Sequence, residues 1–215
     1  MSDMPADEKS MIISYLTLRK AIGIMGLALP IVLYLGGRII FRDGLQPSLS
    51  SYYHTGMGDV LVGMLAAIGF FLFSYRGYER SDDSAGDLAC LFAIGTALFP
   101  AAPNKASLCA PVISEYVHWT FAALLFITLI YFALFLFTKT NPDRDPTPEK
   151  IRRNRVYRGC GYIMGLCIVL IAAHGLFMSD SSIQTYKPVF WLESIIVWAF
   201  GIAWIIKGEA ILGDE

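Results

Sequence analysis

The chain has 215 residues, of which 55% are hydrophobic and only 16% carry a charge. Soluble domains have about 25% charged residues, so this composition excludes an ordinary water-soluble protein and indicates a multi-span membrane protein. The net charge of -1 gives no indication of a nucleic-acid partner. The four cysteines have no CxxC or zinc-finger spacing, so no disulfide framework is predicted.

Six apolar stretches are long enough, or nearly so, to cross a hydrocarbon core of about 30 Å as helices of roughly 20 residues. Val112–Phe137 carries the strongest apolar signal, and Leu88–Pro100 is the shortest stretch. Gly161 and Gly165 form a GxxxG pattern that favours close helix packing. We therefore expect one all-α transmembrane domain, residues 1–215, with spans at Ile22–Ile40, Asp59–Tyr75, Leu88–Pro100, Val112–Phe137, Tyr157–Met178 and Val189–Ile206.

The basic residues predict the orientation of this bundle. With the N-terminus in the cytoplasm, thirteen of the 17 Lys and Arg residues fall on the cytoplasmic side. This excess follows the positive-inside rule, so both termini are expected in the cytoplasm. The linker "KIRRNR" can touch anionic headgroups, and membrane lipids are the expected partners. The basic residues on the outer side are Arg38, Arg42, Lys105 and Lys187.

Ionisable side chains gather at the outer ends of the predicted spans. A charged group in a membrane is costly, so each one is a functional hypothesis by default. Glu115 and His118 are three residues apart and project from one face of a helix. If the bundle closes compactly, the group forms a pocket below the outer interface. Its members are His54, Asp59, Glu115, His118, His174 and Glu193, with Ser50 and Tyr53 of the stretch "SLSSYYHT" beside them.

Each of these residues also has a purely structural explanation. Histidine and tyrosine are common at membrane interfaces, where one end of the side chain stays in water. Glu115 and Glu193 can lie among headgroups or pair with Lys105 and Lys187. Asp59 can be the acidic residue of a helix first turn, and the serines can be ordinary loop hydroxyls.

The functional explanation is a metal site. Histidine and carboxylate suit zinc or another divalent ion, which in catalytic sites commonly has three protein ligands and one water. We expect His54, His118 and His174 as metal ligands, with Asp59 or Glu115 as the general base for the metal-bound water. A serine or tyrosine hydroxyl can stabilise the developing oxyanion.

Ser50-x-x-x-His54 followed by Asp59 resembles the first part of the signature of the CREST superfamily, which includes alkaline ceramidases and PAQR receptors. The resemblance implies a zinc ion on His54, with Ser50 and Asp59 flanking its water and His118 and His174 completing the set. That family has seven spans and a late H-x-x-x-H pair, whereas six spans are predicted here. Most of the chain, including "GTALFP", "FLFTKT" and "FWLE", also resembles small uncharacterised bacterial inner-membrane proteins.

The sequence leaves several functions open. The first is a metal-dependent membrane hydrolase that acts on a lipid or other amphiphile from the outer leaflet. The alternative is a membrane protein that binds a ligand or senses pH without catalysis, since histidine titrates near neutral pH. A transporter or channel is less favoured because the inner halves of the spans offer few polar groups for a path. No Walker A, GxSxG, HExxH or Rossmann pattern is present.

Overall fold

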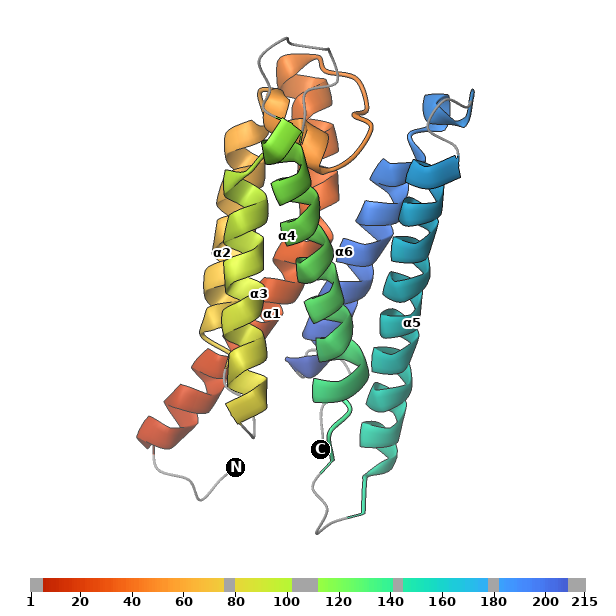
Figure 1. Cartoon of the computed structure of the whole chain (residues 1–215). Helices are drawn as coiled ribbons and strands as arrows, with labels where there is room; N and C mark the ends of the chain where they lie inside the picture. Colours follow the sequence, from red (N-terminus) through yellow and green to blue (C-terminus); the bar gives the residue numbers. More distant parts are fainter. Residues whose placement is uncertain (1–5, 76–79, 102–111, 141–144, 178–181, 209–215) are drawn as a thin grey trace.

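A computed structural model describes residues 6–75, 80–101, 112–140, 145–177 and 182–208. This part of the chain is helical and contains no strand, which confirms the predicted all-α class. Short 3-10 helices, η2 (Ser50–His54) and η4 (Ser182–Tyr186), lie in two connections. The six α-helices are α1 (Ala6–Gly36), α2 (Gly58–Phe73), α3 (Arg80–Leu98), α4 (Val112–Tyr131), α5 (Pro148–Phe177) and α6 (Pro188–Lys207) (Figure 1).

Successive helices run in opposite directions. The lower end of the bundle in Figure 1 holds the starts of α1, α3 and α5 and the ends of α2, α4 and α6. The upper end holds the other six helix ends together with η2 and η4. Of the basic residues that predict the orientation, Arg76, Lys105 and Arg144 lie outside the described residues.

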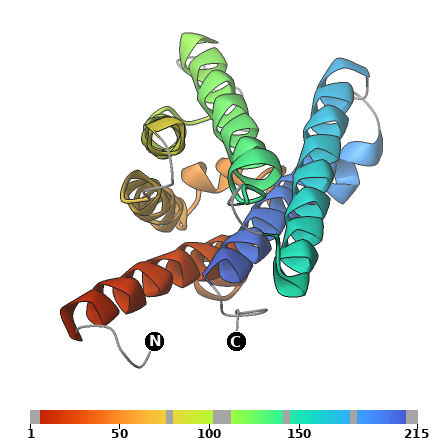
Figure 2. The same ribbon diagram turned by 90° about the horizontal axis from the view of Figure 1, so that it is seen from below.

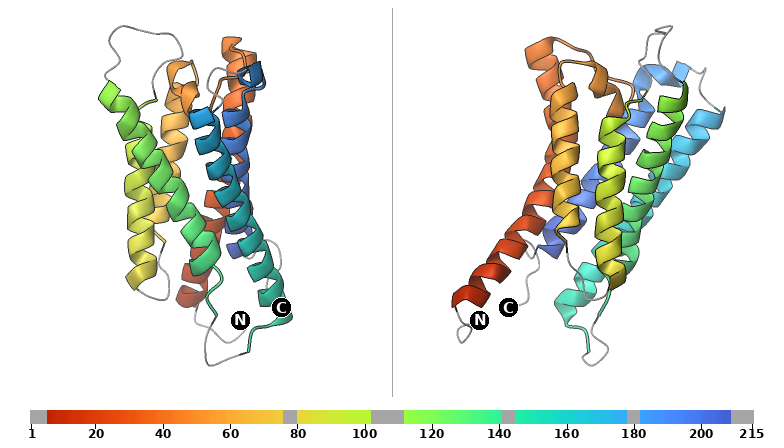
Figure 3. Two further views of the ribbon diagram at one scale, coloured as in Figure 1. Left: turned by 45° about the vertical axis from the view of Figure 1, so that its right-hand side comes forward. Right: turned by 60° about the vertical axis from the view of Figure 1, so that its left-hand side comes forward.

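Four helical stretches among the described residues are long and apolar enough to cross a membrane: Leu16–Phe41, Ser114–Leu136, Pro148–Phe177 and Pro188–Lys207. They coincide with the first, fourth, fifth and sixth predicted spans. The helix α2 is apolar but has only 16 residues. The helix α3 begins eight residues before the predicted span Leu88–Pro100, because its first turns are acidic and carry no apolar signal. Both helices lie alongside the long ones (Figures 1 and 3).

The helices α1 and α6 approach each other closely. A Cβ atom on Gly201 would lie 2.7 Å from the Gly23 carbonyl oxygen, and one on Gly26 would lie 3.3 Å from the Gly201 Cα atom. Only glycine permits this approach of two backbones, and α1 and α6 cross beside each other in Figure 2. The Trp198 indole of α6 also donates to the Leu27 carbonyl oxygen at 3.1 Å, in the turn that precedes Pro30.

The GxxxG pattern of α5 does not mark such a crossing. A Cβ atom on Gly161 would meet the end of the Leu134 side chain, and one on Gly165 would meet no atom within 4 Å. The backbone of α5 therefore stays farther from its neighbours than the backbones of α1 and α6 do.

The helices α2 and α3 pack through small residues. The alanines at every fourth position of α3 are at most 5% exposed. A Cβ atom on Gly86 would lie 2.6 Å from the Leu72 carbonyl oxygen of α2. Small side chains let the two helices approach, and they also explain why α3 has little apolar length of its own. The buried alanines are Ala85, Ala89, Ala93 and Ala97.

Buried aromatic rings fill the lower half of the bundle. Trp204 of α6 lies 5.1 Å from Phe137 and 5.3 Å from Tyr75, centroid to centroid, in edge-to-face contacts. Phe137 follows the π-helical turn η3 (Phe132–Leu136) that extends α4, and its N–H donates to the Phe132 carbonyl oxygen at 2.9 Å. This wider turn shifts the helix face by one residue and directs Phe132 and Phe137 to the same core.

The close crossing of α1 and α6 predicts that Gly201→Ala destabilises the protein by about 1–3 kcal/mol, because the added methyl group overlaps the backbone of α1. Gly165→Ala is the control, and we expect it to leave the unfolding midpoint unchanged or slightly higher because alanine favours a helix. Thermal unfolding of detergent-purified protein, followed by tryptophan fluorescence, measures both midpoints. Equal midpoints for the two variants would contradict the crossing.

Candidate functional site

The stretch "SLSSYYHT" closes the upper end of the bundle. Its 3-10 helix η2 places Tyr52 in the core, with 1% of the residue exposed and its ring 6.2 Å from that of Phe190 in α6. Burial raises the pKa of the Tyr52 phenol, so this side chain stays neutral at physiological pH. The stretch rests on a buried cluster that contains Leu29, Leu33, Leu49, Met57, Leu61 and Val197.

Two hydrogen bonds tie this stretch to the start of α6. The Glu193 carboxylate accepts from the Leu49 N–H group at 2.6 Å, and the Phe190 N–H group donates to the Pro47 carbonyl oxygen at 3.0 Å. Glu193, a predicted pocket residue, thus binds the backbone at the start of η2. A backbone N–H group that loses its acceptor away from water costs free energy, so Glu193 holds the stretch in place.

The serines of the stretch bind one another. The Ser48 hydroxyl lies 2.7 Å from the Ser51 hydroxyl and 3.0 Å from the Ser50 hydroxyl, and it accepts from the Ser51 N–H group at 3.1 Å. This is the local side-chain-to-backbone hydrogen bonding by which serine stabilises a turn. Ser50, predicted as a catalytic residue, is therefore part of the turn that starts η2.

Two predicted metal ligands bind backbone carbonyl groups just after α3. The His118 Nδ1 atom donates to the Phe99 carbonyl oxygen at 2.7 Å, and the His54 Nε2 atom donates to the Ala101 carbonyl oxygen at 2.7 Å. The Ser114 hydroxyl lies 3.4 Å from the Pro100 carbonyl oxygen between them. These carbonyl groups lie just beyond the last turn of α3, outside its helical hydrogen bonds, and side chains are their donors.

The third predicted ligand, His174, lies elsewhere. It is 7% exposed on α5, and its Nε2 atom has no hydrogen-bond partner among the described residues. Near this residue α5 runs beside α6, and the upper ends of α4 and α5 point away from each other (Figures 1 and 2). The structure therefore brings His54 and His118 to one segment and does not bring His174 to them.

The described residues offer no cluster of ligands for the predicted zinc ion. Within the described ranges no group of three or more His, Cys, Asp or Glu side chains is placed to hold a metal ion. His54 and His118 each use one ring nitrogen on a carbonyl group, and His174 extends from a different part of the bundle. The predicted ligand set thus gains no support, and we derive no step through a metal.

A groove of about 410 Å³ lies at the upper end between the start of α2 and the end of α3. Tyr53 and Asp59, two predicted pocket residues, line it, and Asp59 is exposed in the first turn of α2. A Cβ atom on Gly58 would lie 2.4 Å from the Tyr53 carbonyl oxygen, so only glycine fits where the groove wall turns into the helix. The remaining lining residues are Thr55, Gly56, Val62, Ala97 and Leu98.

Two further predicted residues lie outside this groove. Glu115 is half-buried in the first turn of α4, where its charge acts on His118. Ser50 lines a separate small cavity with Tyr53 and His118. Its volume of about 10 Å³ lies at the lower limit for one water molecule.

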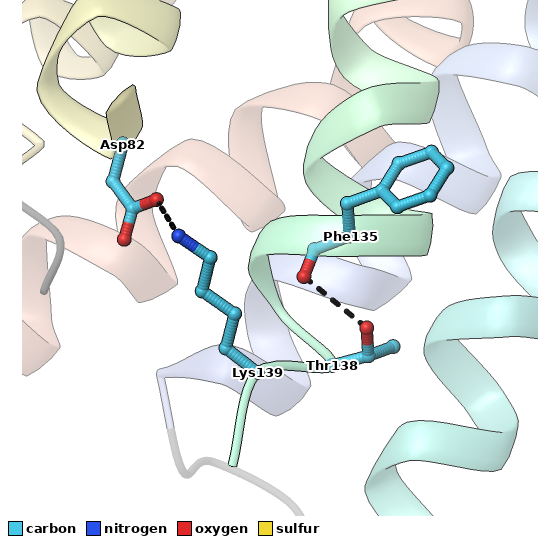
Figure 4. Close-up of polar contacts among 4 residues, drawn as sticks. All are labelled: Asp82, Phe135, Thr138 and Lys139. Carbon is cyan, nitrogen blue, oxygen red and sulfur yellow. Dashed lines mark hydrogen bonds and ion pairs between the residues drawn. The ribbon is translucent and has the colours of Figure 1, made fainter. Parts of the chain in front are cut away.

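The lower end holds charged residues that the sequence analysis does not single out. Asp82, in the first turn of α3, is 1% exposed, and its carboxylate lies 2.5 Å from the Lys139 Nζ atom (Figure 4). Arg153 of α5 is 7% exposed. In the sequence, the basic residues of this end are distinguished only by their position near helix ends. That position is explained equally well by a role as positive-inside anchors.

No family model, curated protein or solved structure matches this chain. The resemblances to the CREST superfamily and to small bacterial membrane proteins therefore remain predictions.

The carbonyl contact predicts that His118→Leu lowers stability by about 0.5–1.5 kcal/mol, because it removes the half-buried hydrogen bond to the Phe99 carbonyl oxygen. His174→Leu is the matched control and removes a buried nitrogen without a partner, so its unfolding midpoint should equal or exceed that of the wild type. Both midpoints are measured by thermal unfolding in detergent. A chelator should leave the wild type unchanged; if it lowers the wild-type midpoint to that of His118→Leu, His118 acts through a metal.

Proposed function

We propose that the protein resides in the bacterial inner membrane, that all six α-helices cross the bilayer, and that both termini are cytoplasmic. Two observations support this topology. Successive helices alternate in direction, as successive spans must, and α2 and α3 lie beside the four long apolar helices. The distribution of Lys and Arg supports the orientation in which the lower end of the bundle faces the cytoplasm.

We further propose that the groove beside Asp59 binds the headgroup of an amphiphile that carries a cationic amine. The single observation that supports this function is that the exposed residue Asp59 lines the groove together with Tyr53. A carboxylate attracts an ammonium group, and an aromatic face adds a cation–π contribution. The apolar side chains of Val62 and Leu98 provide surface for the attached chain.

This is binding without catalysis, the alternative that the sequence left open. A hydrolase would need an activated nucleophile, and the described histidines do not come together with carboxylates as a metal group. His54 and His118 stabilise the frame around the groove through the segment that follows α3. Asp59 and Tyr53 are the predicted site residues that remain in contact with the groove.

Cysteine labelling tests the topology. We expect Gly44→Cys, at an exposed position of the upper end, to react with a membrane-impermeant maleimide in intact cells. Ser74→Cys and Asp145→Cys, at exposed positions of the lower end, should react only after the membrane is permeabilised. Each cysteine is introduced into a background in which the four native cysteines are replaced by serine. Labelling of Ser74→Cys from outside would show that α2 does not cross.

Ligand titration tests the groove. The protein in nanodiscs should bind octyltrimethylammonium and not octyl sulfate, as measured by calorimetry. Asp59→Asn should weaken this binding about tenfold, because it removes the charge that pairs with the amine. Asp43→Asn, the same change at an upper-end aspartate that does not line the groove, should bind as the wild type does. Equal affinities for the wild type and Asp59→Asn would overturn the proposal.

A further inference from the structure

Basic side chains from several helices converge at the lower end of the bundle. Arg19 of α1 donates from Nη1 to the Lys207 carbonyl oxygen at 3.3 Å. Lys150 of α5 donates from Nζ to the Phe137 carbonyl oxygen at 3.0 Å. The Lys207 Nζ atom lies 5.5 Å from the centre of the Phe137 ring. We call Arg19, Lys150, Arg153 and Lys207 the basic cluster.

A layer of aromatic rings holds the cluster together. The Arg19 guanidinium lies 5.6 Å from the centre of the Tyr75 ring, and the Lys150 ammonium lies 6.0 Å from that of Tyr157. Phe137 lies between these rings, with its centroid 6.5 Å from Tyr75 and 5.4 Å from Tyr157. The rings form the buried floor, and the cationic groups lie above it within cation–π distance.

The cluster brings like charges close together. Lys207 interacts with the like charges of Arg19, Lys150 and Arg153 and with the opposite charge of Asp82. Asp82 is in turn bound by Lys139. Like charges repel more strongly near a protein interior than in water, so an anion that approaches these groups relieves part of that repulsion.

The cluster is also placed where such an anion can reach it. Arg19, Lys150 and Lys207 are half-buried, and Lys139 beside them is 28% exposed. Lys150 lies in the first turn of α5 and Lys207 is the last residue of α6, while Arg19 lies near the start of the apolar stretch Leu16–Phe41 of α1. At this depth a membrane presents the phosphate groups of its lipids, and basic pockets between helices bind acidic headgroups.

We propose that the basic cluster binds a phosphate-bearing anion, supplied either by the headgroup of an acidic phospholipid or by free phosphate. The phosphate oxygens accept charge-assisted hydrogen bonds from the lysine and arginine groups, while the aromatic floor fixes the positions of those groups. This site lies at the opposite end of the bundle from the groove beside Asp59 and does not depend on it.

The test uses the full chain purified in detergent, with thermal unfolding as the measurement. Phosphatidylglycerol should raise the unfolding midpoint, and phosphatidylcholine at the same concentration should not, because binding to the folded state stabilises it. Inorganic phosphate separates the two sources. If it raises the midpoint as much as phosphatidylglycerol does, the ligand is free phosphate; if only the lipid does, the ligand is the headgroup.

Lys207→Gln should weaken the binding of the effective anion about tenfold, because it removes one charge-assisted contact. Without an anion it should be at least as stable as the wild type, since one repulsive charge is lost. Lys187→Gln, which changes a lysine at the upper end, is the matched control and should respond as the wild type does. Lys150→Gln repeats the measurement if Lys207→Gln does not fold. The proposal fails if neither anion stabilises the protein more than phosphatidylcholine does, or if both cluster variants respond as the wild type does.

Discussion

A backbone carbonyl or N–H group beyond the end of a helix has no helical hydrogen-bond partner, and leaving it unpaired away from water costs about 1–3 kcal/mol. At the upper end of this protein, side chains provide the partners. His118 and His54 bind the carbonyl groups after α3, and Glu193 binds the start of η2. Most of the polar residues that the sequence predicts as catalytic or metal-binding thus join helix ends through hydrogen bonds. The backbone that they hold in place positions Asp59 at the groove.

Apolar length predicts most of the helices well because membrane crossing sets a minimum length for an uninterrupted helix. The predicted Val189–Ile206 and the observed Pro188–Lys207 differ by one residue at each end. Prediction is poorer where a helix continues through polar residues. The helix α5 starts at Pro148, before its apolar part, and α3 starts with acidic turns and then buries alanine rather than leucine. Neither a polar helix start nor a buried alanine face produces the apolar run from which a span is predicted.

The site is harder to predict than the fold for a physical reason. Hydrogen-bonding groups on the backbone are the same at every position, so the sequence does not show which carbonyl group a histidine will meet. Tyr53 and Asp59 could be placed at one groove because η2 and α2 are adjacent in the chain. The separation of His174 from the other histidines depends on how α5 packs on α6, and the basic cluster depends on contacts between helices far apart in sequence.

The alanine face and acidic start of α3 bear on how the protein enters the membrane during synthesis. A helix whose apolar part is this short partitions poorly by itself, so in the proposed topology α3 depends on α2 for its place in the bilayer. The lysine that neutralises Asp82 is made 57 residues later. At a translation rate of about 5–20 residues per second, this leaves an interval of roughly 3–11 seconds. During that time the buried carboxylate lacks Lys139, and α2 and α3 form a hairpin that is completed only when α4 has been inserted.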